Sequence, residues 1–147
     1  MNIMVRPRVV IDTNCLLQML GARSPYHFLF EVFIQYGYTM CISTEVLLEY
    51  EEILRKKASP LAADLFLRVI VRSRNVIRKD PYYRLRVINK DMDDNKFTDC
   101  AFACQADYIV TDDNHFQDAA NSWFPTFNVI SLDDFAKMME QLYQKQP

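Results

Sequence analysis

Glycine and proline are both scarce in this sequence. Only 2 of the 147 residues are glycine and 6 are proline, whereas 50% of the residues are hydrophobic. This balance is typical of a compact globular protein and excludes a disordered chain. A chain of this length fits one domain, so we expect residues 1–147 to form a single domain with one active site.

Long apolar runs are also missing. No run approaches the roughly 18 residues that a membrane-spanning helix needs, and residues 1–8 lack the apolar core and cleavage site of a signal peptide. We therefore expect a cytoplasmic protein. The four cysteines form no Cys-x-x-Cys pair, so we interpret them as buried thiols rather than zinc ligands or redox groups.

The formal net charge is only -2, but the charges are unevenly distributed. Residues 55–90 contain eleven lysines and arginines and only two acids, Asp64 and Asp80. Such a segment is either a binding surface for RNA or an acidic protein, or the solvated basic face of a helix. Tyr82 and Tyr83 lie within it and would suit stacking on single-stranded bases.

Short apolar segments alternate with amphipathic ones along the chain. Strands are expected at Val9–Ile11, Thr39–Ile42, Val76–Ile77, Tyr108–Val110 and Val129–Ile130. Helical spacing covers residues 15–20, 26–36, 44–55, 60–74, 94–104, 113–119 and 132–142, and Gly37 would end the second helix as a C-terminal cap. This alternation predicts an α/β protein with three layers, α/β/α, around a central, mainly parallel sheet.

Acidic residues follow two of the expected strands directly. Asp12 comes after the first strand and Asp113 lies just beyond the fourth, at the strand ends where parallel sheets place their ligands. Glu49 lies beside the apolar stripe of its helix, and the segment Asp91–Asp94 brings three acids to a helix start. Each acid also has a simpler interpretation, as a helix cap or part of a solvated face.

The repetition of these acids favours a metal site. Carboxylates gathered at one edge of a sheet repel one another unless a cation neutralises them, and oxygen ligands suit Mg²⁺ or Mn²⁺. A metal held in this way activates water for phosphodiester cleavage. The two histidines, His27 and His115, have no partners in the sequence that would indicate a catalytic triad.

Four segments together resemble the PIN domain family. They are Val-Val-Ile-Asp-Thr-Asn-Cys-Leu (9–16), Ile-Ser-Thr-Glu-Val-Leu-Leu-Glu-Tyr (42–50), Asp-Met-Asp-Asp-Asn-Lys-Phe (91–97) and Asp-Tyr-Ile-Val-Thr-Asp-Asp (107–113). They occur in the order that the family uses. The third segment resembles the branch formed by toxin components of toxin–antitoxin systems, relatives of the VapC-type ribonucleases.

The resemblance implies a PIN-like fold and a metal-dependent endoribonuclease that hydrolyses RNA. It further implies that the protein is a toxin with a cognate antitoxin protein, and that it forms a homodimer. By position, the metal-binding and catalytic acids would be Asp12, Glu49 and Asp94, with Asp113 as a fourth, more variable ligand. Asn14 and Thr111 would orient these carboxylates or a bound water.

Two departures from the family pattern keep alternatives open. The run of acids leaves Asp93 as a competitor of Asp94, which we prefer because the helix that starts there leads directly toward Asp113. Asp112 replaces the usual small residue between Thr111 and Asp113. One alternative function is a non-catalytic PIN-like module that binds RNA or protein. Another is a phosphoryl-transfer enzyme with Asp12 as nucleophile, disfavoured because Asp-Thr-Asn lacks a second aspartate two positions on.

Overall fold

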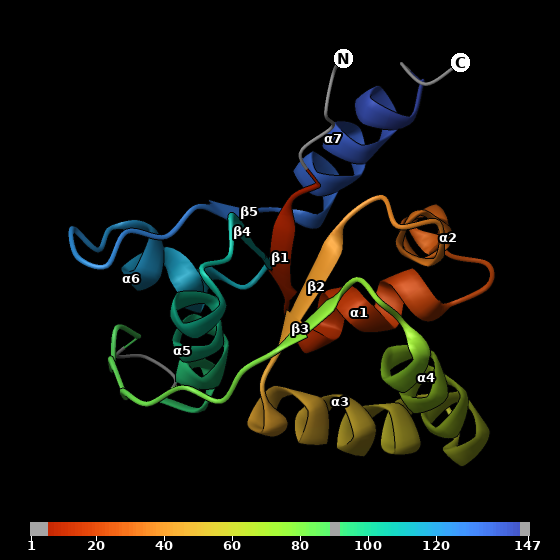
Figure 1. Ribbon diagram of the computed structural model, residues 1–147, viewed down its shortest axis with the longest axis horizontal. Coiled ribbons are helices and arrows are strands. Elements are labelled where there is room, and N and C mark those ends of the chain that lie inside the picture. Colours follow the sequence, from red (N-terminus) through yellow and green to blue (C-terminus); the bar gives the residue numbers. More distant parts are fainter. Residues whose placement is uncertain (1–5, 89–91, 145–147) are drawn as a thin grey trace.

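The central feature of the computed structural model, which describes residues 6–88 and 92–144, is a five-stranded sheet with the order β3-β2-β1-β4-β5 (Figure 1). The strands are β1 (Arg8–Ile11), β2 (Thr39–Ile42), β3 (Val76–Arg78), β4 (Tyr108–Val110) and β5 (Val129–Ile130). Every neighbouring pair of strands is parallel. The sequence-based strand predictions are therefore confirmed, including the edge position of β3.

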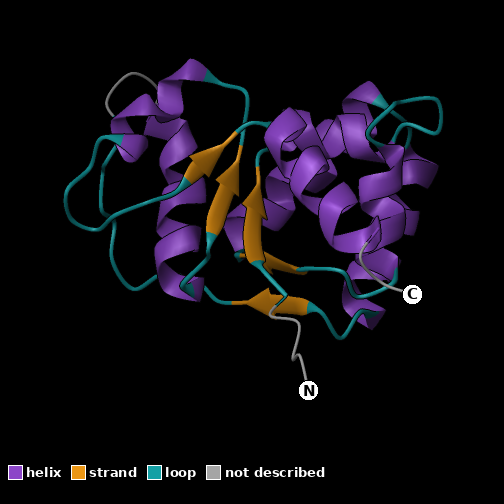
Figure 2. Ribbon diagram, turned by 90° about the horizontal axis from the view of Figure 1, so that it is seen from above, coloured by secondary structure: helices purple, strands orange, loops and turns teal. Residues whose placement is uncertain are grey.

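Helices lie on both faces of this sheet (Figure 2). They are α1 (Thr13–Leu20), α2 (His27–Ile34), α3 (Thr44–Lys57), α4 (Pro60–Arg72), α5 (Asn95–Cys104), α6 (Gln117–Ala120) and α7 (Leu132–Gln144), with 3₁₀ turns η1 (Met92–Asp94) and η2 (Asn114–Phe116). Helix α5 packs against β1, β2 and β4, whereas α1 packs against α2 and α3. The predicted three-layer α/β/α architecture with a parallel sheet is confirmed.

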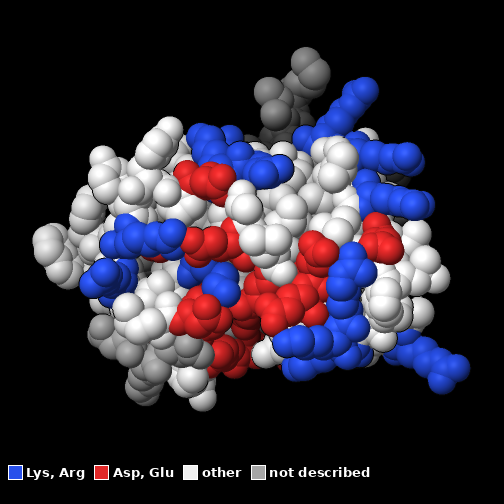
Figure 3. Space-filling view, turned by 90° about the horizontal axis from the view of Figure 1, so that it is seen from below, with Lys and Arg blue, Asp and Glu red and all other residues white. Residues whose placement is uncertain are grey.

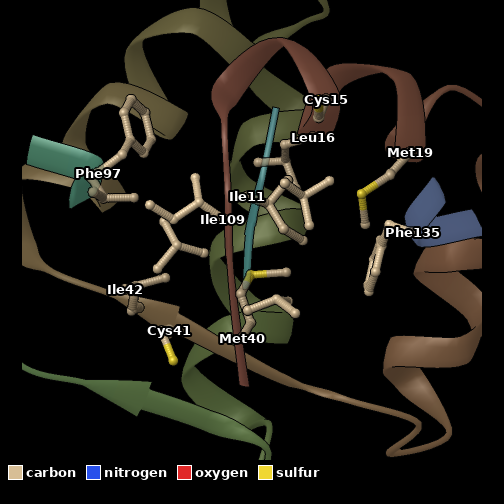
Figure 4. Close-up of a cluster of buried hydrophobic side chains, with 14 of the residues drawn as sticks. Ile11, Cys15, Leu16, Met19, Met40, Cys41, Ile42, Phe97, Ile109 and Phe135 are labelled. Atoms are coloured by element: carbon tan, nitrogen blue, oxygen red, sulfur yellow. The ribbon is translucent and has the colours of Figure 1, made fainter. Parts of the chain in front are cut away.

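The core is built on both faces of the central strands. In Figure 4, Phe97 of α5 lies on one side of β1, and Met19 and Phe135 lie on the other side. These three side chains are at most 1% exposed, as is Ile11 of β1 itself. Full burial of one such side chain stabilises a fold by about 1.5–3 kcal/mol. Burial on both faces explains why the strands read as continuous apolar runs.

Two serines determine where the helices that flank β2 and β3 begin. The Ser43 hydroxyl accepts a hydrogen bond from the backbone N–H of Val46, which fixes the start of α3. Ser59 does the same for Ala62 at the start of α4, where Pro60 occupies the first turn. Helix α3, which contains Glu49, runs along the carboxyl-end edge of the sheet (Figure 1).

The connection between α2 and β2 corrects one expectation. Tyr36, not Gly37, adopts the left-handed conformation, with φ of 64°. A Cβ atom on Gly37 would lie 2.3 Å from Cγ1 of Val32, and its backbone N–H donates to the Val32 carbonyl at 2.8 Å. Gly37 is therefore required because the chain passes close to α2, rather than because the backbone needs a positive φ.

Other expectations have simpler outcomes. All four cysteines are buried and free, as predicted. Within residues 6–88 and 92–144, no helix is long and apolar enough to cross a membrane. The expected helix-start acid Asp91 and the basic residue Lys90 lie outside the described residues.

Candidate metal centre

The predicted acids come from four elements that meet at the carboxyl ends of the strands. Asp12 lies between β1 and α1, and Asp113 between β4 and η2. Glu49 comes from α3, and Asp94 stands at the start of α5. Seen from below in Figure 3, acidic side chains gather in the centre of this face and basic side chains surround them.

Asp12 is buried at the centre of this edge, with 6% of its surface exposed. It stands at the N-cap position of α1, but its side chain makes no capping hydrogen bond. Instead, its Oδ2 accepts a hydrogen bond from the Thr111 hydroxyl at 2.9 Å. Burial raises the pKa of Asp12 to about 6. The hydrogen bond from Thr111 lowers this pKa, whereas the charges of Asp113 and Glu49 raise it further. The interpretation of Asp12 as a cap is therefore wrong.

Thr111 connects the two strand-end acids. Its hydroxyl donates to Asp12, and the same oxygen accepts the backbone N–H of Asp113 at 3.0 Å. These two bonds fix the turn after β4 relative to the turn after β1. Thr111 thus occupies the orienting position that was expected of it. Asn14 is exposed, and its neighbour Thr13 hydrogen-bonds Glu49 instead.

Asp94, Asp113 and His115 form a compact group of metal-type ligands. One potential ligand atom from each lies within 4.8 Å of those of the other two. His115 Nδ1 is 3.7 Å from Asp94 Oδ2 and 3.5 Å from Asp113 Oδ1. The two carboxylates suit Mg²⁺ or Mn²⁺, and the imidazole favours a transition metal.

Asp113 has a second role in the same turn. Its Oδ1 accepts the backbone N–H of His115 at 2.9 Å and so caps η2. Asp113 therefore both caps a helical turn, as one interpretation of the sequence expects, and lies beside other potential metal ligands. The cap fixes the side chain where it also faces Asp94 and His115.

Glu49 lies beside this group but is held by other partners. One carboxylate oxygen accepts a hydrogen bond from the Thr13 hydroxyl, and the other is 2.8 Å from the ammonium of Lys96. Its side chain is only 19% exposed. Its charge lies near enough to Asp12 to contribute to the raised pKa of that carboxyl.

The geometry distinguishes Asp94 from Asp93. The Asp94 side chain is 15% exposed and faces His115, whereas that of Asp93 is 73% exposed and pairs with Lys96 at 3.1 Å. The arrangement favours Asp94 as the ligand, in line with the sequence-based preference. The assignment of all four acids as ligands stays a prediction.

Asp112 explains one departure from the family pattern. Its Oδ1 accepts the backbone N–H of Leu132, the first residue of α7, at 3.0 Å. An acid at this position satisfies a helix N-terminus that has no partner within its own helix. Asp112 therefore fastens α7 to the β4 turn.

Sequence reasoning missed several residues that shape the site. His115 has one signal in the sequence, its position two residues after Asp113, but no partner there that would indicate a catalytic triad. Lys96 and Asn95 had no separate signal. The buried side chain of Asn95 bonds both the N–H and the carbonyl of Ile88, at 2.9 and 3.0 Å, and so holds the preceding segment against the start of α5.

Within residues 55–88 of the basic segment, some of the basic side chains are paired with acids. Arg55 pairs with Glu51 and Asp64, and Lys56 pairs with Glu52. Near the acids, a cavity of about 300 Å³ is lined in part by Arg84, Arg86 and Lys96. Basic groups thus stand directly beside the acidic edge.

Tyr82 and Tyr83 lie at a different place. They are 98% and 70% exposed and line a groove of about 940 Å³ together with Phe102, Phe124 and Phe127. This groove follows the carboxyl-terminal half of α5, whereas the acids lie at its amino-terminal end. Base stacking by these tyrosines stays a prediction.

The fold is a parallel sheet between two layers of helices, and carboxylates gather at the carboxyl ends of its strands. These features define a class of α/β proteins whose site is suited to a divalent cation. A model of the PIN domain family matches residues 8–115. The chain belongs to the PIN domain family, as its sequence motifs indicated. A search of curated proteins gave no match.

Solved structures with the same fold include three from toxin–antitoxin systems. A chain of the VapBC2 complex of Rickettsia felis, bound to a DNA fragment from its promoter, has a TM-score of 0.57 at 17% identity, covering 84% of this chain and 98% of that one. A chain of DNA-bound VapBC from Salmonella typhimurium has a TM-score of 0.53 at 15% identity, covering 88% and 99%. VapC20 of Mycobacterium tuberculosis, a toxin that cleaves the sarcin–ricin loop, has a TM-score of 0.50 at 13% identity, covering 69% and 86%.

Proposed function

We propose that this PIN domain is a divalent-metal-dependent endoribonuclease that hydrolyses phosphodiester bonds of RNA. The observation that carries the proposal is the group of Asp94, Asp113 and His115, whose ligand atoms lie within 4.8 Å of one another. They stand at the edge of the sheet where Asp12 and Glu49 also converge. Carboxylates and an imidazole gathered in this way suit a metal-bound water as the nucleophile.

The residues present fit a divalent cation. Burial raises the pKa of the Asp12 carboxyl, and the charges of Asp113 and Glu49 add to this effect. A cation near Asp12 would favour its ionised form. Asp94, Asp113 and His115 would hold Mg²⁺ or Mn²⁺, with Asp12 beside them. The bound ion would supply a water activated for attack on the scissile phosphate.

The chain's own residues would then position the water and the RNA. Thr111 fixes Asp12 and the Asp113 turn relative to each other, so both carboxylates keep their orientation during the reaction. Arg86 and Arg84, which also pairs with Glu45 at 2.6 Å, line the neighbouring cavity, where they would bind phosphates on one side of the cleaved bond. Such contacts supply affinity without reading the base sequence.

We further propose that the nuclease acts as the toxin of a toxin–antitoxin pair. The motif of residues 91–97 resembles the toxin branch of the family. The fold likeness to chains of VapBC complexes and to the RNA-cleaving toxin VapC20 supports the same role. A cognate antitoxin protein would be the cellular partner.

The test combines metal binding with RNA cleavage. Purified protein is titrated with Mn²⁺ by calorimetry and incubated with end-labelled RNA in the presence of Mn²⁺, Mg²⁺ or EDTA. We expect metal binding and cleavage that EDTA abolishes. Asp94→Asn should lose both, whereas Asp93→Asn, which changes the same charge at the more exposed neighbour, should retain metal binding.

Three results would contradict the proposal. Absence of Mn²⁺ binding would exclude the metal centre. RNA binding without cleavage, with metal supplied, would favour the non-catalytic PIN-like module. Equal losses in Asp93→Asn and Asp94→Asn would overturn the assignment of Asp94.

A further inference from the structure

The connection that follows β3 runs alongside α5. The buried side chain of Asn95, the first residue of α5, bonds the backbone of Ile88 at 2.9 and 3.0 Å. About one turn further along α5, Asp99 accepts the backbone N–H of Leu85 at 3.0 Å. Residues 79–83 then line a groove with the carboxyl-terminal half of α5. The connection and the helix therefore lie side by side in opposite directions (Figure 1).

This groove, of about 940 Å³, is aromatic and exposed. Its rings come from three segments: Tyr82 and Tyr83 of the connection, Phe102 of α5, and Phe124 and Phe127 between α6 and β5. The exposed fractions of Tyr82, Phe124 and Phe102 are 98%, 72% and 40%. Rings so far outside the core contribute little to the stability of the fold. A group of exposed rings is instead typical of a binding surface.

Basic side chains lie along the same path. Arg84 and Arg86 line the cavity beside the start of α5, and the side chain of Arg84 is 61% exposed. Lys79 lines the aromatic groove itself. Asp80, the acid in that groove, accepts hydrogen bonds from the backbone N–H and the hydroxyl of Thr44, at 2.7 and 3.0 Å. From the start of α5 to its end, the path passes from acids to arginines and then to rings.

This order indicates what the groove binds. Proteins that bind single-stranded nucleic acid combine cations, which follow the phosphates, with aromatic rings, on which the bases stack. A duplex keeps its bases inside the helix, so its bases cannot reach such rings. From Asn95 to Phe102, α5 rises about 10 Å at about 1.5 Å per residue. This distance corresponds to about three nucleotides of a stacked strand, at about 3.4 Å each.

Resting on the proposed nuclease function, we propose that the aromatic groove is a second subsite for the RNA substrate. It stacks unpaired bases of the strand whose phosphate lies at the acidic edge, a few nucleotides away from the cleaved bond. The substrate class is then RNA with a single-stranded segment, such as a loop, rather than a continuous duplex. Tyr82 and Tyr83 contribute affinity for this segment and take no part in the chemical step.

The experiment measures RNA binding without cleavage. Wild-type protein in EDTA is titrated against a fluorescein-labelled, unstructured RNA of about eight nucleotides, within the range of single-strand sites, and against an RNA duplex. Fluorescence anisotropy gives the Kd. The double variant Tyr82→Ala/Tyr83→Ala should bind the single strand about 5- to 150-fold more weakly, as expected for the loss of one stacked base. Its Kd for the duplex should equal that of the wild-type protein.

Two further variants separate stacking from other effects. Tyr82→Phe/Tyr83→Phe keeps both rings and should bind the single strand as the wild-type protein does. Leu61→Ala is the matched control, because it removes an apolar side chain that is 68% exposed on α4, outside the groove. It should also bind normally. With 2-aminopurine in the single strand, stacking should quench the fluorescence on the wild-type protein and not on the alanine double variant.

The outcomes distinguish this inference from the proposed function. Unchanged single-strand binding by the folded alanine variant, or an equal loss for the duplex, would overturn the stacking subsite. A dimer of the wild-type protein that the alanine variant dissociates, measured by sedimentation, would assign the groove to a second copy of the chain. In these cases metal-dependent cleavage by the wild-type protein would leave the nuclease proposal intact. No RNA binding by the wild-type protein, in EDTA or with Ca²⁺, would overturn both.

Discussion

Replacement of Asp12 by asparagine should stabilise the metal-free protein at neutral pH. The Asp12 carboxyl is 6% exposed, and its pKa rises from 3.8 to about 6 because the site is desolvated and acidic. A rise of this size corresponds to about 3 kcal/mol of unfavourable free energy for the ionised carboxylate in the folded state. Asparagine removes the charge and still offers an oxygen to the Thr111 hydroxyl, which now donates to Asp12 at 2.9 Å.

The effect has a defined pH window. Below the unfolded pKa of 3.8, Asp12 is protonated in both the folded and the unfolded state. Its charge then does not lower the stability of the wild-type protein relative to Asp12→Asn. As pH rises, the unfolded chain releases the Asp12 proton first, so the folded state loses stability until pH passes the folded pKa of about 6. The advantage of Asp12→Asn should therefore grow between about pH 4 and pH 6 and reach a plateau near pH 7.

The assay is urea unfolding of both proteins across this pH range, in EDTA, followed by circular dichroism. Glu140→Gln, which removes an exposed acid on α7, is the matched control and should show no such growth. Saturating Mn²⁺ at neutral pH should stabilise the wild-type protein more than Asp12→Asn. A stability difference that stays constant from acid to neutral pH would refute the reasoning that Asp12 is an uncompensated buried charge.

Four further predictions follow from single contacts. Thr111→Val removes the hydroxyl that orients Asp12 and should lower the RNA cleavage rate about 10- to 100-fold, with Mn²⁺ still bound by calorimetry. Ser43→Ala removes the cap of α3 and should cost about 1 kcal/mol in urea unfolding. Gly37→Ala places a Cβ 2.3 Å from Val32 Cγ1 and should cost about 1–3 kcal/mol, part of which Val32→Ala recovers; no recovery would contradict the proposed clash. Asp112→Ala should lower thermal stability by releasing α7 and leave Mn²⁺ affinity unchanged; weaker Mn²⁺ binding would instead make Asp112 part of the site.

Local patterns were sufficient to predict most of the fold. Ser43 and Pro60 mark helix starts through interactions with residues a few positions away, and the buried strands read as apolar runs. Contacts between distant segments were not predictable in this way. Lys96 meets Glu49 across 47 residues, and Asp112 meets the start of α7 across 20. Neither pairing follows from spacing or periodicity, because both depend on how α3, α5 and α7 are placed around the sheet.

The strand register explains why two such distant segments nevertheless form one site. β1 and β4 are neighbours in the sheet, with Ile11 level with Val110, and the N–H of Asp12 donates to the Val110 carbonyl at 3.0 Å. Asp12 and Thr111 are the first residues after β1 and β4, so the parallel register brings them together at the same edge. A shift of one residue would turn the side chains of β1 to the opposite face and separate this pair. The buried apolar residues of β1, by fixing the register, therefore help to fix the position of Asp12 together with its hydrogen bond to Thr111.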